Sequence, residues 1–203
     1  MTPVYSSCSI AVPPGQVSAA LEPLAGVRLD GGTLCGCWYA EIGRLNRILM
    51  VHAFDDIASL SAAHDAQIRS GSPLGLGALA SAVEFDAYAM FPGVSFMPAG
   101  RYGPMYEVRT YQLKRDGLAA TFDAWAKVRE ARIRISPLAA VMYGISGQLP
   151  RFMHIWPYPS LDARMALRGA AVTAGIWPPP GGLPHIETMR SEIYLPAPFS
   201  PLQ

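Results

Sequence analysis

The chain has 203 residues, with 16 Lys and Arg side chains against 15 Asp and Glu side chains, so its formal net charge is +1. Because it has neither a basic excess nor a basic run, the sequence argues against a nucleic-acid partner and against binding to a membrane surface. Apolar residues make up 51% of the chain and charged residues only 15%, which predicts a large core and little ionic surface.

The N-terminal segment 1–16 contains no Lys or Arg and no long apolar run, so we expect no signal peptide and a cytoplasmic protein. The longest uncharged stretches, 135–150 and 169–184, are interrupted by Pro and Gly and are too short for a membrane helix. The three cysteines (Cys8, Cys35 and Cys37) lack a His or a fourth Cys at metal-ligand spacing. We therefore expect reduced core cysteines, no metal site and no cofactor.

The sequence matches itself at an offset of 104 residues. Four identities fall in nine positions, and they place Tyr39, Gly43, Leu45 and Arg47 on Tyr143, Gly147, Leu149 and Arg151. At slightly different offsets the segment 4–12 falls on 105–113, and 84–89 falls on 190–195. These matches predict a duplicated unit, with a first repeat at 1–91, a Pro- and Gly-rich linker at 92–104 and a second repeat at 105–203.

The elements are clearest in the second repeat, and the first repeat is expected to follow the same order. Alternation predicts strands at 105–113, 138–145, 152–158 and 187–195, and Gly147 suits a tight turn between the second and third of these. Helical spacing predicts helices at 118–131 and 161–173. Ser160 is the expected N-cap of the second helix, and Asp56 stands at the equivalent position of the first repeat.

The order β-α-β-β-α-β is the ferredoxin-like arrangement, and here it occurs twice. Each repeat would form a four-stranded antiparallel sheet with both helices on one face, so that the other face needs cover. We therefore predict an α+β fold in which the two sheets pack face to face as one barrel from a single chain.

Three segments of the second repeat resemble the NIPSNAP family: YEVRTYQLKRDGL at 106–118, YGISGQLPRFMHIWPYPSLDAR at 143–164 and SEIYLPAPFSPL at 191–202. The segment 38–60 is a weaker copy, although Glu41 and Asn46 keep the family's strand-turn-strand pattern where the second repeat has Ile145 and Pro150. The resemblance implies the dimeric α/β-barrel fold of that family. It implies no chemistry, because NIPSNAP members share no agreed activity and a fold does not fix a function.

Charged and aromatic residues alternate along the strand 105–113. Glu107, Arg109 and Tyr111 share one face of it, whereas the equivalent first-repeat positions carry no charge: Ser6, Cys8 and Ile10. A fused duplicate can specialise one half, so we expect one polar and one plain side of the barrel. Glu107 and Arg109 are candidates for a pocket wall, and a structural ion pair between neighbouring strands is the alternative.

On the strand 152–158, His154 and Trp156 share one face, and Met153 and Ile155 share the other. We expect the aliphatic pair to pack on the helices, so that His154 and Trp156 point into the barrel. His154 is then a candidate acid or base, with a satisfied interior histidine or a metal or haem ligand as alternatives.

Two further positions are candidates for the same interior. His52 aligns with Trp156, which would allow a two-histidine site, although no carboxylate stands at obvious ligand spacing. Tyr143 matches Tyr39, and either tyrosine could donate a hydrogen bond to a ligand or simply fill the sheet surface. In the loop 177–184, Trp177 could cover a barrel mouth, or the loop could be a rigid Pro-rich connection.

Two hypotheses about function follow from these residues. The first is a binding protein that holds a small apolar or aromatic molecule between the two sheets, and that could also associate with further copies of itself. The second is a cofactor-independent enzyme of the monooxygenase, isomerase or lyase type, with His154 as acid or base and Arg109 holding an anionic oxygen. The absence of any nucleophile or cofactor motif favours the first hypothesis.

Overall fold

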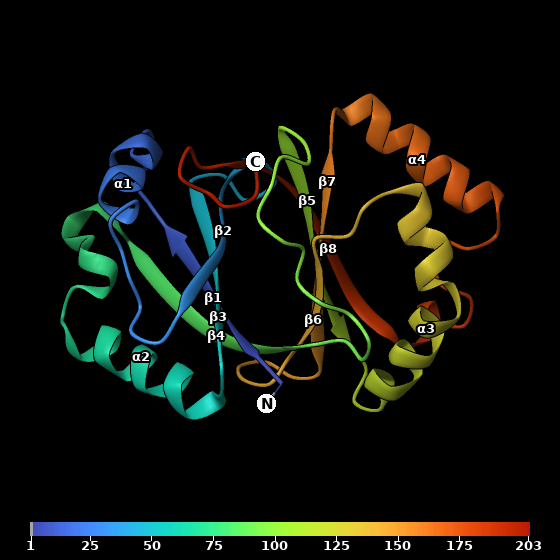
Figure 1. The fold of residues 1–203 in the computed structure, drawn as a ribbon, viewed down its shortest axis with the longest axis horizontal. Coiled ribbons are helices and arrows are strands. Elements are labelled where there is room, and N and C mark those ends of the chain that lie inside the picture. The colour runs from blue at the N-terminus through green and yellow to red at the C-terminus, as the bar shows by residue number, and fades with distance from the viewer. Residues whose placement is uncertain (1) are drawn as a thin grey trace.

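The computed structural model describes residues 2–203, and its two halves contain the same order of elements (Figure 1). The first half comprises β1 (Val4–Ala11), α1 (Val17–Leu24), β2 (Thr33–Ile42), β3 (Arg47–Phe54), α2 (Ile57–Arg69) and β4 (Ala82–Met90). The second half comprises β5 (Met105–Leu113), α3 (Gly117–Ile135), β6 (Ala140–Gly144), β7 (Arg151–Tyr158), α4 (Leu161–Thr173) and β8 (Ile186–Pro196). A short 3-10 turn, η3 (Leu183–His185), precedes β8. The structure thus contains each strand and helix predicted for the second half, and α3 extends beyond its predicted end.

All eight strands form one closed barrel in the order β1-β3-β2-β8-β5-β7-β6-β4. Each half contributes four adjacent antiparallel strands in the ferredoxin-like order, and the halves join where β2 pairs with β8 and β4 pairs with β6. The prediction of a single α+β barrel from one chain is therefore confirmed. The two sheets do more than face each other, because hydrogen bonds between them close the barrel at both edges.

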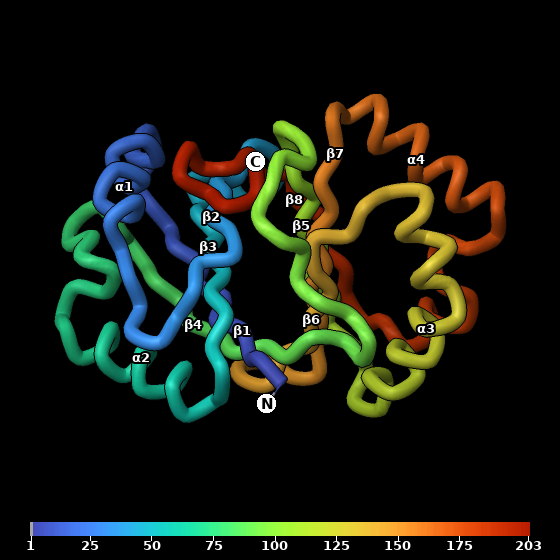
Figure 2. Tube along the Cα trace, viewed as in Figure 1, coloured from blue at the N-terminus to red at the C-terminus, as the bar shows by residue number. Residues whose placement is uncertain are grey.

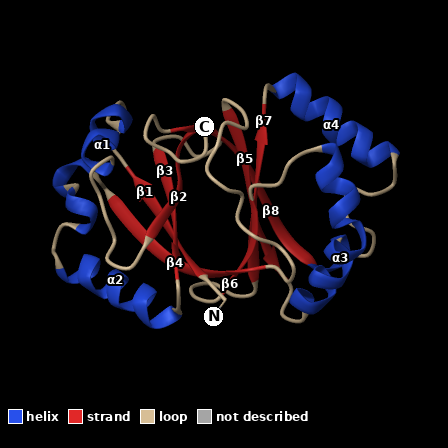
Figure 3. Cartoon of the chain, viewed as in Figure 1, coloured by secondary structure: helices blue, strands red, loops and turns tan. Residues whose placement is uncertain are grey.

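Helices lie on the two outer sides of the strands (Figure 3), and the buried side chains form three clusters. Helices α1 and α2 cover the outer face of the first-half strands, and α3 and α4 cover the outer face of the second-half strands, so the strands lie in the middle. Both halves fill the barrel interior with large side chains, including Tyr5, Trp38, Tyr88, Tyr106 and Tyr194. The strands are thus covered on both faces, which explains the low charge of the sequence.

The connection between the halves and the C-terminal segment run side by side against the barrel interior (Figure 2). The backbone N–H of Gly100 donates to the carbonyl of Pro201 at 3.0 Å, and the N–H of Gln203 donates back to the Gly100 carbonyl at 2.9 Å. Phe96 and Leu202 pack on the interior cluster from these two segments. Together the two segments add apolar cover that the eight strands alone do not supply.

Local sequence features determine where two of the helices begin. The carboxylate of Asp56 accepts a hydrogen bond from the N–H of Ser59 at 2.8 Å, and the hydroxyl of Ser160 accepts one from the N–H of Ala163 at 3.1 Å. These are the N-caps predicted from the sequence, and they occupy equivalent places at α2 and α4. Gly147 adopts a φ of 73° in the β6–β7 turn, a conformation that glycine tolerates without steric cost.

The prediction of which face of β7 points inward was wrong. Met153 and Ile155 belong to the cluster inside the barrel, whereas Trp156 belongs to the cluster under α3 and α4, and His154 lies on the same side as Trp156. The error has a physical reason, because both faces of a covered strand are buried and aliphatic side chains suit either of them. The polar and aromatic cluster therefore lies between the sheet and the helices of the second half, not between the two sheets.

Candidate functional site

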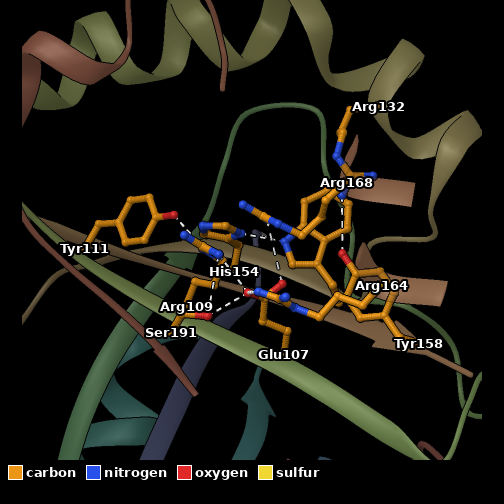
Figure 4. A network of polar contacts seen from close by, with 10 residues as sticks. Glu107, Arg109, Tyr111, Arg132, His154, Tyr158, Arg164, Arg168 and Ser191 are labelled. Carbon is orange, nitrogen blue, oxygen red and sulfur yellow. Dashed lines mark hydrogen bonds and ion pairs between the residues drawn. The ribbon is translucent and has the colours of Figure 1, made fainter. Parts of the chain in front are cut away.

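The candidate site lies on the outer face of β5, β7 and β8, beneath the helices of the second half (Figure 4). In the β5–β7 pairing Glu107 is opposite Trp156, Arg109 is opposite His154, and Tyr111 is opposite Phe152. The cross-strand pairs bring together five of the residues singled out from the sequence: Glu107, Arg109, Tyr111, His154 and Trp156. The expected clustering of these residues is thus present, although on the other face of the sheet.

Glu107 is the centre of a hydrogen-bonded charge cluster. The side chain is fully buried, and its Oε1 accepts hydrogen bonds from Arg109 Nη1 at 2.7 Å and from Arg164 Nη2 at 2.5 Å. The hydroxyl of Ser191 on β8 donates to the same oxygen at 2.6 Å. Arg168 Nη1 lies 3.8 Å from Oε2, which accepts no hydrogen bond from the described residues. One carboxylate is therefore surrounded by three guanidinium groups.

The charge cluster carries an excess of positive charge. Burial by itself would raise the pKa of Glu107, but the hydrogen bond from Arg164 and the charge of Arg109 lower this pKa to about 2, so the carboxylate is ionised. Burial and the nearby Arg109 lower the pKa of Arg168. A single negative charge offsets only one of the three arginines, so this part of the protein attracts anions.

His154 lies beneath this cluster and is fully buried. Its Nδ1 accepts a hydrogen bond from Trp156 Nε1 at 2.5 Å, which in the neutral ring leaves the proton on Nε2. Burial, and then the charge of Arg109, lower the pKa of His154 well below its usual value. His154 is therefore neutral, and its lone pair is already used by the indole of Trp156.

Arg132 on α3 is a second unusual cation of this layer. It is 1% exposed and its guanidinium carbon lies 4.2 Å from the ring centre of Trp156 and 5.2 Å from that of Trp177. Its Nη2 donates to the hydroxyl of Tyr158 at 3.3 Å, and within residues 2–203 no carboxylate lies at ion-pair distance from it. The two indole faces are the main source of electrostatic stabilisation for this buried charge.

A pocket of about 220 Å³ opens beside the charge cluster. Guanidinium groups of Arg109 and Arg168 form its polar side, and Tyr111, Trp125 and Trp177 contribute aromatic walls. Pro178, Pro179 and Leu183 continue the apolar lining, so the Pro-rich loop forms part of the pocket. Tyr111 is oriented by Arg109, whose Nε donates to the phenol oxygen at 2.5 Å. Cations on an apolar surface suit an organic anion.

Two of the residues that were expected to share the barrel interior with His154 lie elsewhere in the structure. His52 lies on the helix side of the first half, because its neighbours along β3, Met50 and Phe54, belong to the cluster beneath α1 and α2. The two-histidine site is therefore not formed. Tyr143 stacks edge-on against Phe122 and does not line the pocket.

Three residues of the charge cluster were missed by the sequence reasoning: Arg164 and Arg168 on α4, and Ser191 on β8. Arg164 and Arg168 stand four residues apart, which places both on one face of the helix predicted there. That spacing was a usable signal, because a cationic pair on a helix that covers a sheet calls for an anionic partner on that sheet. Ser191 carried no comparable signal.

Within residues 2–203 no group of three or more His, Cys, Asp and Glu side chains is arranged to hold a metal ion. None of the helices in the same range is long and apolar enough to cross a membrane.

Comparison with protein families identifies similarity to the NIPSNAP family, whose model matches residues 106–201. Protein NipSnap homolog 2 of Homo sapiens is 32% identical over 114 residues, which cover 52% of this chain and 38% of the human protein. The NipSnap homolog of Dictyostelium discoideum is 23% identical over 154 residues, which cover 72% of this chain and 66% of that protein. The human match thus involves well under half of the relative's length.

Solved structures with the same fold span nearly the whole chain. An anthrone oxidase-like protein superposes with a TM-score of 0.68 at 10% identity and covers 97% of this chain and 92% of its own. A protein from Lactobacillus acidophilus superposes with a TM-score of 0.65 at 8% identity, covering 97% and 95% of the two chains. At such low identities these likenesses show the dimeric α/β-barrel type of fold and no more.

Proposed function

We propose that the second half of the chain, which matches the NIPSNAP family model over residues 106–201, binds a small organic anion with an apolar or aromatic body. The observation that carries the proposal is the pocket lined by Arg109 and Arg168 on one side and by aromatic side chains on the other. Three guanidinium groups share one carboxylate there, so an anionic ligand would offset part of the remaining positive charge. The ligand would bind on the helix side of the sheet, which replaces the position expected from the sequence.

The two guanidinium groups that line the pocket are well prepared for this role. Glu107, Tyr111 and Ser191 restrict Arg109 from three directions, so little side-chain freedom remains to be lost on binding. Arg168 has no hydrogen bond to Glu107, and its guanidinium therefore has N–H groups left for a ligand. A planar carboxylate matches such a pair of cations.

The geometry favours binding over turnover. An enzyme that used His154 as a base would need its lone pair, which Trp156 occupies, and His154 does not line the pocket. We therefore propose that His154 orients Trp156 and the aromatic wall. Catalysis through His154 and Arg109 stays a prediction, as do a cytoplasmic location, self-association and the absence of nucleic-acid partners.

A titration that monitors tryptophan fluorescence tests the proposal, because Trp125 and Trp177 line the pocket. We expect benzoate to change the fluorescence with saturation, and the neutral analogue benzamide to bind at least tenfold more weakly. Arg168→Gln should weaken benzoate binding about tenfold, a loss of ~1.4 kcal/mol. Arg69→Gln, which removes the same charge from an exposed site on α2, should leave binding unchanged.

Two results would refute the proposal. One is equal binding of benzoate and benzamide, because the arginines would then contribute nothing. The other is the absence of saturable binding by every member of a panel of aromatic and aliphatic carboxylates, with the wild-type chain folded.

A further inference from the structure

A separate cavity lies on the helix side of the first half, where the segment between α1 and β2 covers the sheet. Its volume is about 420 Å³, and Arg28, Thr33 and His52 are its polar lining residues. Val27, Leu34 and Phe199 supply apolar surface. It shares no residue with the pocket of the second half, so binding there is independent of the function proposed above.

His52 is the unusual residue of this cavity. Its side chain is 2% exposed, and neither Nδ1 nor Nε2 has a hydrogen-bond partner among residues 2–203. Leaving a buried N–H donor and a buried ring acceptor unpaired is costly, and such groups in native proteins normally have a partner. A ligand in the cavity would supply that partner.

The neighbouring strands do not supply it in this structure. In the sheet His52 lies between Ser6 on β1 and Leu34 on β2. The hydroxyl of Ser6 is 2.7 Å from His64 Nε2 and is engaged there, and Leu34 has no polar side-chain atom. The cavity, which His52 lines, is a place from which a ligand could offer the ring a hydrogen bond.

Arg28 adds a positive charge to the cavity. Its Nη1 donates to the carbonyls of Ala25 at 3.2 Å and Val27 at 2.8 Å, which fixes the guanidinium and leaves its other N–H groups available. In the described part of the chain no carboxylate lies within ion-pair distance of Arg28. The site therefore offers one cation, one neutral imidazole and an apolar wall.

The second half fills the equivalent place with its own side chains. His52 corresponds to Trp156, and the guanidinium of Arg132 lies 4.2 Å from the indole ring centre there. Trp177 covers the other side of Arg132 at 5.2 Å. In the second half the guanidinium of Arg132 thus occupies the space next to Trp156. In the first half the space next to His52 is an open cavity that a ligand could fill.

We propose that this cavity binds a small carboxylic acid that carries a second hydrogen-bonding oxygen, with the carboxylate on Arg28 and the second oxygen on His52. An apolar body between these groups would contact Val27, Leu34 and Phe199. Hydroxybenzoates have this combination of groups, and benzoate is the matched ligand that lacks the second oxygen.

Histidine NMR tests the proposal directly, because the chain has only four histidines. In protein labelled in the imidazole rings, 3- and 4-hydroxybenzoate are titrated and the signals are assigned with single His variants. We expect the His52 signal to shift with saturation for at least one of the two, while the His154 signal shows no coupled change at the same midpoint. Benzoate should shift the His52 signal at least tenfold more weakly.

Variants distinguish this cavity from the pocket of the second half. Arg28→Gln should weaken the effect on His52 at least tenfold, while Arg101→Gln, an exposed Arg outside the cavity, should not. Arg168→Gln should leave the His52 titration intact, so that failure of one site does not imply failure of the other. Arg28→Gln keeps the His52 ring whose signal reports binding, so the test is decisive without a substitution of His52 itself.

The proposal is overturned if neither hydroxybenzoate shifts the His52 signal in the folded wild-type chain. If the ring N–H proton of His52 exchanges with water and the His52 signal responds to no carboxylate, water alone supplies the hydrogen bonds of the ring. Unchanged binding in Arg28→Gln would equally overturn it.

Discussion

The two halves of the barrel build the same helix-covered sheet with different chemistry under the helices. At equivalent places on the outer face the first half has Ser6, Cys8 and Ile10, and the second half has Glu107, Arg109 and Tyr111. On the covering helices Leu60 and His64 stand where the second half has Arg164 and Arg168. The first half shows that the layer packs without a buried charge cluster, so the fold itself does not require one. Buried ion pairs rarely stabilise a protein more than apolar packing would, and this supports the proposal that the cluster serves a ligand.

The largest expected effect in this comparison comes from Glu107. Glu107→Gln removes the only carboxylate among three arginines and leaves buried positive charges uncompensated. We expect the free energy of unfolding to fall by ~3–5 kcal/mol, measured by urea unfolding at neutral pH.

The matched control is Glu84→Gln in the first half, where the carboxylate is exposed and lies 3.9 Å from Arg47. That change should cost less than ~1 kcal/mol. Equal losses in the two variants would contradict the view that the second half alone depends on a buried carboxylate.

A smaller effect should appear as acid sensitivity, because each half contains one buried neutral histidine. Burial, followed by the charges of Arg28 and His64, lowers the pKa of His52 to about 4, and the pKa of His154 is also lowered. In the unfolded chain both rings take up a proton near pH 6.5, whereas in the folded chain they do so only at lower pH. The unfolded state therefore binds more protons, and the free energy of unfolding falls as the pH drops from about 6.5 towards 4.

For His52 this loss amounts to up to ~3 kcal/mol at pH 4, and urea unfolding at pH 7, 6, 5 and 4 measures it. His52→Phe and His154→Phe should each flatten the pH dependence in this window. The carboxylate of Glu107 acts at lower pH, because its pKa of about 2 lies below the unfolded value and its stabilisation is lost only between about pH 4.5 and 2. An unchanged slope between pH 6.5 and 4 in both variants would show that the two rings are not kept neutral by burial.

Sequence reasoning reached the fold because the signals for it are local. Alternation defines β5 and β7, and Asp56 and Ser160 cap equivalent helices, so the order of elements can be obtained without any knowledge of packing. The orientation of β7 could not be obtained in this way. Alternation says which residues share a face, and only the packing of Met153 and Ile155 inside the closed barrel decides which face is the interior.

The site was predictable in part for the same reason. The shared face of Glu107, Arg109 and Tyr111 follows from spacing along one strand. The approach of Arg164 and Arg168 depends on how α4 crosses the sheet, and the unpaired state of His52 depends on a hydrogen bond made by its neighbour. Such features arise from tertiary contacts, and sequence spacing does not contain them.

Removing a helix N-cap should give the smallest change in the free energy of unfolding. It tests whether the equivalent caps of α2 and α4 still stabilise the two halves equally. Ser160→Ala removes the hydrogen bond to the N–H of Ala163 and should cost ~1 kcal/mol by urea unfolding. Asp56→Ala should destabilise the chain in the same direction, because it removes the equivalent bond to the N–H of Ser59. Asp56→Asn is the control that keeps a capping oxygen and removes the charge, and it should recover most of the loss. If the free energy of unfolding falls in only one of the two alanine variants, the two caps no longer stabilise their helices equally. Matching losses would instead confine the divergence of the halves to the residues beneath the helices, which is where both pockets lie.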